Sequence, residues 1–163
     1  MNVREADGDD VAGIRGVARR SWETDYPEIL SRETIAEGVE EWYASDRLAF
    51  DIASDDAHVL VASGAGDEGV IGFAHAVGAS GTGTLLRLYV DPDRRDAGVG
   101  TRLLETACDR LAAAGCTAVE AMVLAENEPG NAFYHGFGFE PVREGETAIG
   151  DEPHEEIVYV LTL

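Results

Sequence analysis

The sequence predicts an α+β protein in which helices flank a mixed, mostly antiparallel sheet. Three observations lead to this fold class. The chain has 163 residues, the length of one ordinary domain, so we expect residues 1–163 to form a single domain. Hydrophobic residues make up 45% of the chain, which is enough for a buried core. Apolar residues recur at helical spacing in some segments, while several strand-like runs follow one another without helices between them.

The first half of the chain predicts one strand, two helices and then three strands. Residues 1–6 have the pattern of a short strand. Asp7 and Ser31 are each suited to begin a helix, because their side-chain oxygens accept hydrogen bonds from first-turn amides. Pro27 ends the first of these helices. Glycine-rich turns then separate three apolar runs typical of antiparallel strands. These runs span residues 58–62, 70–77 and 84–90.

The second half predicts two helices and three strands. A helix over 98–114 carries one apolar face, and Gly115 is suited to end it. A strand over 118–124 and a short helix over 129–138 follow. Two closing strands joined by an acidic loop are expected. The last strand would either lie buried in the sheet or pair at a sheet edge, including the edge of a second copy in a homodimer. The closing strands span 139–146 and 157–163.

The charge of the chain excludes several functions. Twelve basic and 32 acidic residues give a net charge of −20, and every basic residue is arginine. Without lysine, a Walker A phosphate loop and a Schiff-base lysine are both excluded. The negative charge disfavours nucleic acids and anionic membranes as partners. Because acid excess and lysine loss occur together, we interpret the chain as halophilic rather than as an ordinary acidic protein. Molar salt shortens the Debye length to about 3 Å and screens self-repulsion.

Cysteine content and hydropathy predict a cytoplasmic location. Cys108 and Cys116 are too few for a disulfide framework and lack partners at zinc-finger spacing, so we expect free thiols and no metal. Residues 1–10 are acidic and lack the apolar run of a signal peptide. No segment approaches the roughly 18 apolar residues that a membrane-spanning helix needs.

The segment between the strand over 84–90 and the following helix has the pattern of an anion site. Glycines at 98 and 100 open the helix, whose first amides lack intrahelical partners and lie at the positive end of the helix dipole. Such a helix end binds phosphate. Residues 87–102 hold four Arg and three Asp, a local charge of +1 within a chain of −20. We therefore favour an anion site over a purely structural turn.

Two other ligand motifs fail at this segment. A dinucleotide fingerprint would need a third glycine at position 103, where the chain has Leu103. A calcium loop that begins at Asp91 would need a carboxylate at position 102, which is Arg102.

Two spaced motifs carry a resemblance to a known family. The first is Arg95-x-x-Gly98-x-Gly100, after a strand that ends in Leu88-Tyr89-Val90-Asp91-Pro92. The second has the spacing Asn-x6-Tyr-x3-Gly-Phe and consists of Asn127, Tyr134, Gly138 and Phe139. Together with the expected order of elements, they resemble the GCN5-related N-acetyltransferase (GNAT) family over essentially the whole chain.

The resemblance implies the GNAT fold and an N-acetyltransferase that uses acetyl-CoA to acetylate a primary amine of a small molecule or a protein N-terminus. In the family, the strand before the first motif pairs with the pantetheine arm, and the amides of the motif hold the pyrophosphate. Asn127 matches a position that hydrogen-bonds the cofactor. Tyr134 matches the residue that protonates the leaving thiolate, the catalytic role implied here. The implied cofactor-binding residues are Leu88, Tyr89, Val90, Arg95, Asp96, Ala97, Gly98, Val99, Gly100, Thr101, Asn127 and Tyr134.

The chain departs from the family pattern in two places. Asp96 stands where many members have glycine, and residues 84–87 lack the glutamate that often serves as general base. The base is therefore unassigned, with Glu126 or a water chain as candidates and His75 either a base or a structural residue. The missing carboxylate favours a non-catalytic acyl-CoA sensor as the alternative function, whereas Tyr134 favours the enzyme. Four aromatic residues either line an amine pocket or pack in the core: Trp22, Tyr26, Trp42 and Tyr43.

Overall fold

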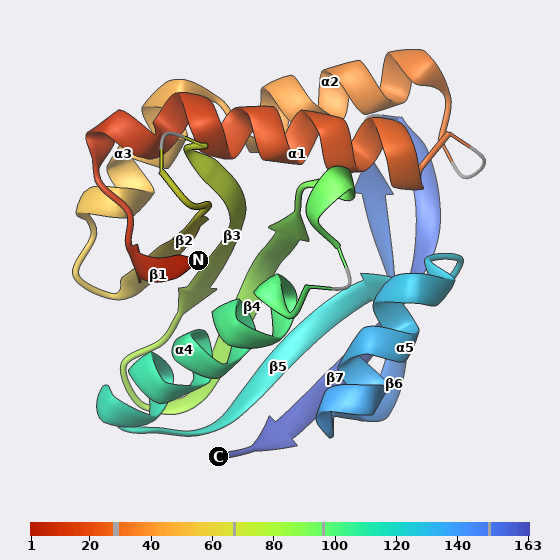
Figure 1. The fold of residues 1–163 in the computed structure, drawn as a ribbon. Helices are drawn as coiled ribbons and strands as arrows, with labels where there is room; N and C mark the ends of the chain where they lie inside the picture. Colours follow the sequence, from red (N-terminus) through yellow and green to blue (C-terminus); the bar gives the residue numbers. More distant parts are fainter. Residues whose placement is uncertain (28–29, 67, 96, 150) are drawn as a thin grey trace.

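A seven-stranded mixed sheet lies between two groups of helices in the computed structural model, which describes residues 1–27, 30–66, 68–95, 97–149 and 151–163 (Figure 1). The strand order is β1-β2-β3-β4-β5-β7-β6, and only β4 and β5 are parallel neighbours. The expected mixed, mostly antiparallel sheet is thus confirmed. The strands are β1 (Asn2–Glu5), β2 (Ala57–Ser63), β3 (Val70–Val77), β4 (Gly81–Val90), β5 (Cys116–Leu124), β6 (Glu140–Ile149) and β7 (Glu152–Thr162).

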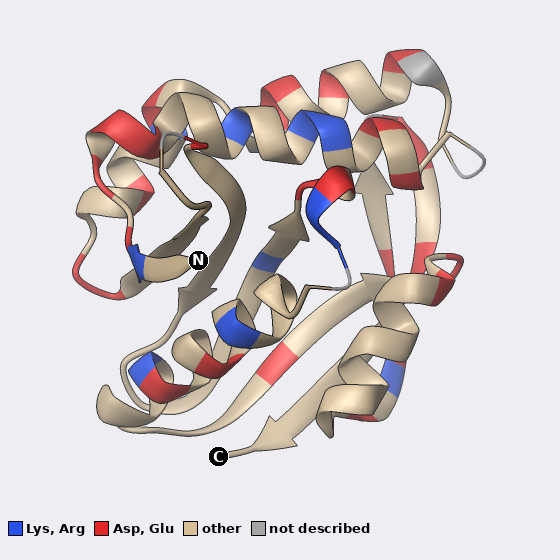
Figure 2. Cartoon of the chain, in the orientation of Figure 1, with Lys and Arg blue, Asp and Glu red and all other residues tan. Residues whose placement is uncertain are grey.

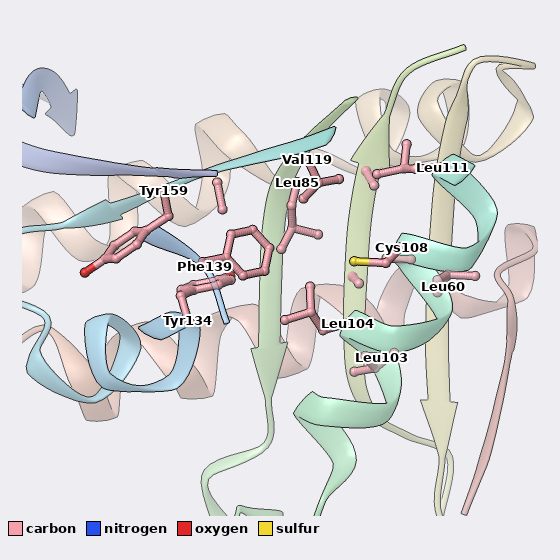
Figure 3. Packing of buried hydrophobic residues seen from close by; sticks show 14 of the residues in the cluster. Leu60, Leu85, Leu103, Leu104, Cys108, Leu111, Val119, Tyr134, Phe139 and Tyr159 are labelled. Carbon is pink, nitrogen blue, oxygen red and sulfur yellow. The ribbon is translucent and has the colours of Figure 1, made fainter. Parts of the chain in front are cut away.

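Helices cover both faces of the sheet, and each face has its own buried core. Helices α1, α2 and α3 pack on one face, and α4 and α5 pack on the other (Figure 1). On the second face, leucines of α4 contact the strands, and three aromatic rings gather beside α5 (Figure 3). Among the described residues, no helix is long and apolar enough to cross a membrane. The helices are α1 (Val11–Asp25), α2 (Arg32–Trp42), α3 (Ser45–Ala53), α4 (Val99–Ala113) and α5 (Glu128–Phe137).

Local signals account for most of these elements. Ser31 begins α2 and accepts a hydrogen bond from the Thr34 amide, as expected. Asp7 caps a short 3₁₀ turn that leads into α1. Helix α3 was not predicted, because its nine residues bury only Leu48 and so show little apolar periodicity. The two cysteines are free and buried, as expected.

The closing hairpin differs from the sequence-based prediction. The strands extend to Ile149 and resume at Glu152, and these two residues pair with each other, so the segment expected as an acidic loop is largely strand. Half-buried and exposed residues alternate over Glu152–Glu156, and this alternation is typical of a strand with one exposed face. Strand β7 lies between β5 and β6, so the alternative of a closing strand within the sheet is confirmed and the alternative of an edge strand is wrong; the edge strands are β1 and β6.

Strands β4 and β5 separate partway along their length (Figure 1). Their parallel pairing runs from Gly81 opposite Cys116 to Leu85 opposite Ala121, although both strands continue beyond this pair. At the same point β4 has an irregularity, where the β3 partner shifts and Leu86 is left out of the register. The sheet therefore opens between the carboxyl ends of its two parallel strands.

Candidate active site

A cleft of about 700 Å³ occupies the opening between β4 and β5. Its lining comes from both cores, so the cleft passes through the sheet from one layer of helices to the other. The α4 side of the cleft includes Val99, Gly100, Asn127, Phe133 and Tyr134. The α1 side includes Trp22, Tyr26, Tyr89, Leu124, Ile149 and Glu156.

The amino end of α4 presents backbone amides to the α4 side of the cleft. Gly98 precedes the helix with a φ of +80°, a left-handed conformation that favours glycine, and no side chain caps the helix. The first-turn residues from Val99 to Thr101 line the cleft. A Cβ added at Gly100 would lie 3.4 Å from Phe133 Cζ, an ordinary contact distance, so the start of α4 packs directly beside α5. Unpartnered amides at a helix start suit a phosphate group.

The exposed half of β4 forms one wall of the cleft. Leu88, Tyr89 and Val90 all line it, beyond the last residue of β4 that pairs with β5. The carbonyl of Val90 already accepts hydrogen bonds from Ser21 Oγ at 3.2 Å and Arg95 Nε at 3.3 Å. The Val90 carbonyl is therefore already hydrogen-bonded within the chain. The residues of β4 just before it, Leu88 and Tyr89, border the opening.

Two arginines of the predicted anion site, Arg94 and Arg95, are held by carboxylates of the chain. Arg95 forms a two-pronged ion pair with Asp25 at 2.5 and 2.8 Å, and Arg94 pairs with Glu68. The basic stretch before α4 thus lies beside acidic residues of other segments (Figure 2). The Arg95 side chain fastens the loop to the end of α1, so the amides remain as the anion-binding groups. Ala97 is exposed outside the cleft lining, and Asp96 lies outside the described residues.

Helix α5 is fixed to β5 by two asparagines. Asn127 begins the helix, and its Oδ1 accepts a hydrogen bond from the Gly130 amide at 3.1 Å. Asn131 was not singled out in the sequence. Its Nδ2 donates to the carbonyls of Asn127 and Leu124 at 2.7 and 3.0 Å, and its Oδ1 accepts from the Tyr159 hydroxyl at 2.6 Å. The sequence held one signal for Asn131, its position one turn after the capping Asn127. Its partner on β7, Tyr159, could not be inferred from the sequence.

Tyr134 is both packed in the core and part of the cleft lining. Its ring stacks on Tyr159, with centroids 6.1 Å apart, and meets Phe133 and Phe139 edge-on (Figure 3). The residue is 9% exposed. Burial raises the pKa of the Tyr134 hydroxyl well above its ordinary value of 10, so the hydroxyl keeps its proton at neutral pH. Tyr134 therefore packs in the core and also lines the cleft.

The aromatic residues of α1 and α2 divide between cleft and core. Trp22 and Tyr26 line the cleft, and the Tyr26 hydroxyl lies 3.3 Å from that of Tyr89. Tyr43 is fully buried, with its ring edge-on to Phe73. The Trp42 side chain lies outside the described residues.

The candidate bases of the sequence analysis lie away from the cleft. His75 is buried beneath it, with Nδ1 3.2 Å from Nη1 of Arg87, a residue that does line the cleft. Burial and the nearby Arg87 charge lower the pKa of His75 to about 4. Glu126 is exposed outside the lining. The described carboxylates that line the cleft are instead those of Asp25, Glu41 and Glu156.

Glu156 is a further cleft residue that the sequence analysis did not identify. It lies on β7, and burial raises the pKa of its carboxyl group. The sequence did not single out Glu156, because the adjacent Glu155 has the same residue type although it points to the opposite face of the sheet. In the described part of the chain, no group of three or more His, Cys, Asp or Glu is placed to hold a metal ion.

Comparisons with known proteins agree on one family. A sequence model described as the acetyltransferase (GNAT) family matches residues 17–139. A spermidine N(1)-acetyltransferase of Thermoplasma acidophilum is 28% identical over 141 residues, which cover 85% of this chain and 88% of that protein. The crystal structure of the PaiA N-acetyltransferase from Thermoplasma acidophilum in complex with coenzyme A superposes with a TM-score of 0.86 at 26% identity, over 99% of this chain and 98% of that one. The ribosomal-protein-S18-alanine N-acetyltransferase of Escherichia coli shares the fold, with a TM-score of 0.75 at 18% identity over 99% of this chain and 92% of that one.

Proposed function

This chain belongs to the acetyltransferase (GNAT) family and is an N-acetyltransferase; from that premise we propose that it acetylates a primary amine of a small molecule or a protein N-terminus, with acetyl-CoA as donor and Tyr134 as general acid. One observation carries the proposal. A single cleft passes through the sheet and joins the amino end of α4 to the pocket under α1, with Tyr134 on its wall. A donor and an acceptor entering from opposite faces can therefore meet inside it.

The α4 side suits coenzyme A. The first-turn amides of α4 would hold the pyrophosphate, and the free edge of β4 would hydrogen-bond the amide-containing pantetheine arm, as a strand pairs with a peptide. The Arg95–Asp25 pair holds the loop before α4, and the Asn127 cap holds the start of α5 on the same side of the cleft. The likeness to a structure in complex with coenzyme A supports this placement of the donor.

Tyr134 would assist the departure of the sulfur. When bound, acetyl-CoA supplies the acetyl group and a thiolate as leaving group. The amine nitrogen forms a bond to the carbonyl carbon while the carbon–sulfur bond breaks, and Tyr134 Oη gives its proton to the sulfur. The nitrogen loses its own proton to solvent, and Tyr134 Oη regains a proton from solvent, so protons balance and the tyrosine is restored. The raised pKa of Tyr134 keeps the donor form present throughout the neutral range.

The acceptor is expected to be a cationic amine. The net charge of −20 attracts cations at low salt, and the similarity to a spermidine N(1)-acetyltransferase supports polyamines as the first acceptors to test. A family assignment as acetyltransferase favours catalysis over the alternative of an acyl-CoA sensor.

The test measures thiol release from acetyl-CoA over a panel of amines and peptides in concentrated KCl. Tyr134→Phe is expected to lower kcat by about 100-fold or more, because general acids contribute this much, with the Kd for coenzyme A unchanged. His135→Asn, at an exposed neighbouring position of α5, is the matched control and should behave as the wild type. A Tyr134→Phe enzyme with unchanged kcat would refute the general-acid role. Absence of coenzyme A binding in calorimetry would refute the donor site.

A further inference from the structure

Glu156 places a half-buried carboxylate on the α1 side of the cleft. It pairs across the sheet with Leu124 of β5 and Gly145 of β6, and cross-strand partners point to the same face. Leu124 belongs to the core under α1, so Glu156 points toward that layer as well. In the described part of the chain, no hydrogen bond or ion pair engages its carboxylate.

The arginine whose charge acts on Glu156 is engaged by another carboxylate, because Arg143 of β6 donates to Glu120 of β5 at 2.5 Å. Among the other carboxylates of the cleft lining, Asp25 is bound by Arg95. The charge of Arg143 lowers the pKa of Glu156, but burial outweighs it and the net shift is upward. Glu156 is thus a partly desolvated carboxylate that no cation of the described residues contacts in an ion pair.

Apolar residues line the cleft on the same face of the sheet as Glu156. A Cβ at Gly145 would lie 3.4 Å from Glu156 Oε1, so the carboxylate lies over this glycine. Apolar side chains of Leu124 and Ile149 line the cleft on the same face, and Met122, also in the lining, is partly exposed on β5. An apolar wall that ends in one carboxylate matches a hydrocarbon chain that ends in an ammonium group.

Positive charges of the cleft lie on other elements. Arg47 belongs to α3, and Arg87 belongs to β4, where its guanidinium lies 5.1 Å from the centre of the Tyr43 ring. These arginines would attract an acceptor carboxylate, whereas the β7 wall attracts a cation. Glu156 would therefore repel an acceptor that carries a carboxylate and attract an acceptor that carries a second ammonium group.

We propose that Glu156 binds a second, non-reacting ammonium group of the acceptor, so that the enzyme prefers diamines and polyamines to monoamines. This inference rests on the proposed N-acetyltransferase function. With the far ammonium on Glu156, the alkyl chain lies along Leu124 and the other amine reaches the opening between β4 and β5. Glu156 acts here as a specificity-determining residue.

The test compares 1,4-diaminobutane with butylamine, which has the same carbon chain and one amine. The wild type should prefer the diamine by about tenfold or more in kcat/KM, the scale of one charge-assisted hydrogen bond. Glu156→Gln should remove this preference mainly through KM, with the Kd for coenzyme A unchanged. Glu155→Gln is the matched control, because Glu155 is exposed and adjacent on β7, and its side chain points to the opposite face.

A second variant of Glu156 distinguishes a loss of charge from a folding defect. Glu156→Asp keeps the charge and should retain part of the diamine preference, and melting temperatures report whether each variant is folded. A wild type that turns over both amines equally, or prefers acceptors that carry a carboxylate, overturns the proposal. So does a Glu156→Gln enzyme that keeps the preference. If no amine of any kind is acetylated while coenzyme A binds, the proposed function fails, and the inference fails with it.

Discussion

Acidification is expected to weaken the fold through His75. The residue is 3% exposed on β3, and its Nδ1 lies 3.2 Å from Arg87 Nη1. An arginine stays protonated, so the ring accepts this hydrogen bond and is neutral in the folded protein. Burial, and then the Arg87 charge, lower the pKa of His75 from 6.5 to about 4.

The size of the effect follows from these two pKa values. The unfolded chain takes up the proton near 6.5, whereas the folded protein does so only near 4. Stability from a neutral His75 is therefore fully present above 6.5 and is lost as the pH falls through 4. Over this window the loss amounts to about 3 kcal/mol. Protonation would also remove the acceptor from Arg87 and place two like charges side by side.

The assay is urea unfolding at constant high salt, at several values between about pH 7 and about pH 4. His75→Gln keeps an oxygen that can accept from Arg87 but does not titrate. The free energy of unfolding of the wild type should fall relative to this variant by about 3 kcal/mol as the pH is lowered, because carboxylate titrations are common to both and cancel. His135→Gln, on the exposed side of α5, should follow the wild type. Parallel curves for wild type and His75→Gln would show that the residue titrates normally and refute the reasoning.

Three further predictions test the surroundings of the cleft. Asp25→Asn removes the charge that holds Arg95 and should raise the Kd for coenzyme A about tenfold in calorimetry, because the loop must then be ordered on binding; an unchanged Kd would contradict this role. Tyr159→Phe removes the 2.6 Å hydrogen bond to Asn131 but keeps the ring under Tyr134. Tyr159→Phe should lower the free energy of unfolding by about 1 kcal/mol and lower kcat, with the Kd for coenzyme A unchanged. A kcat equal to that of the wild type would contradict this role of Tyr159. Transfer from molar to millimolar KCl should lower the melting temperature, and indifference to salt would defeat the halophilic interpretation.

Patterns that act over a few residues were predictable from the sequence. The glycines at 98 and 100, the cap at Ser31 and the apolar face of α4 each depend on neighbours along the chain. The second motif, with Asn127 and Tyr134, lies on one short helix for the same reason. Helix α3 was missed because a short helix with a single buried residue has little periodicity to detect.

Contacts between distant segments could not be predicted in this way. Arg95 meets Asp25 from 70 positions away in the chain, and Tyr159 meets Asn131 from 28 positions away. Nothing in the local sequence distinguishes Glu156 from Glu155; only the pairing of β7 between β5 and β6 points one into the cleft and the other to the opposite face.

The sequence by itself determined which functional groups the protein has: a helix start with unpaired amides, a tyrosine on a short helix and an acidic, lysine-free composition. These features depend on residue type and on neighbours along the chain, so they do not require knowledge of the tertiary structure. Tertiary structure decided which groups face one another, because the separation of β4 and β5 joins the two faces of the sheet at a single cleft. That opening turns the helix start, Tyr134 and Glu156 into neighbours of one site, and no local pattern encodes it.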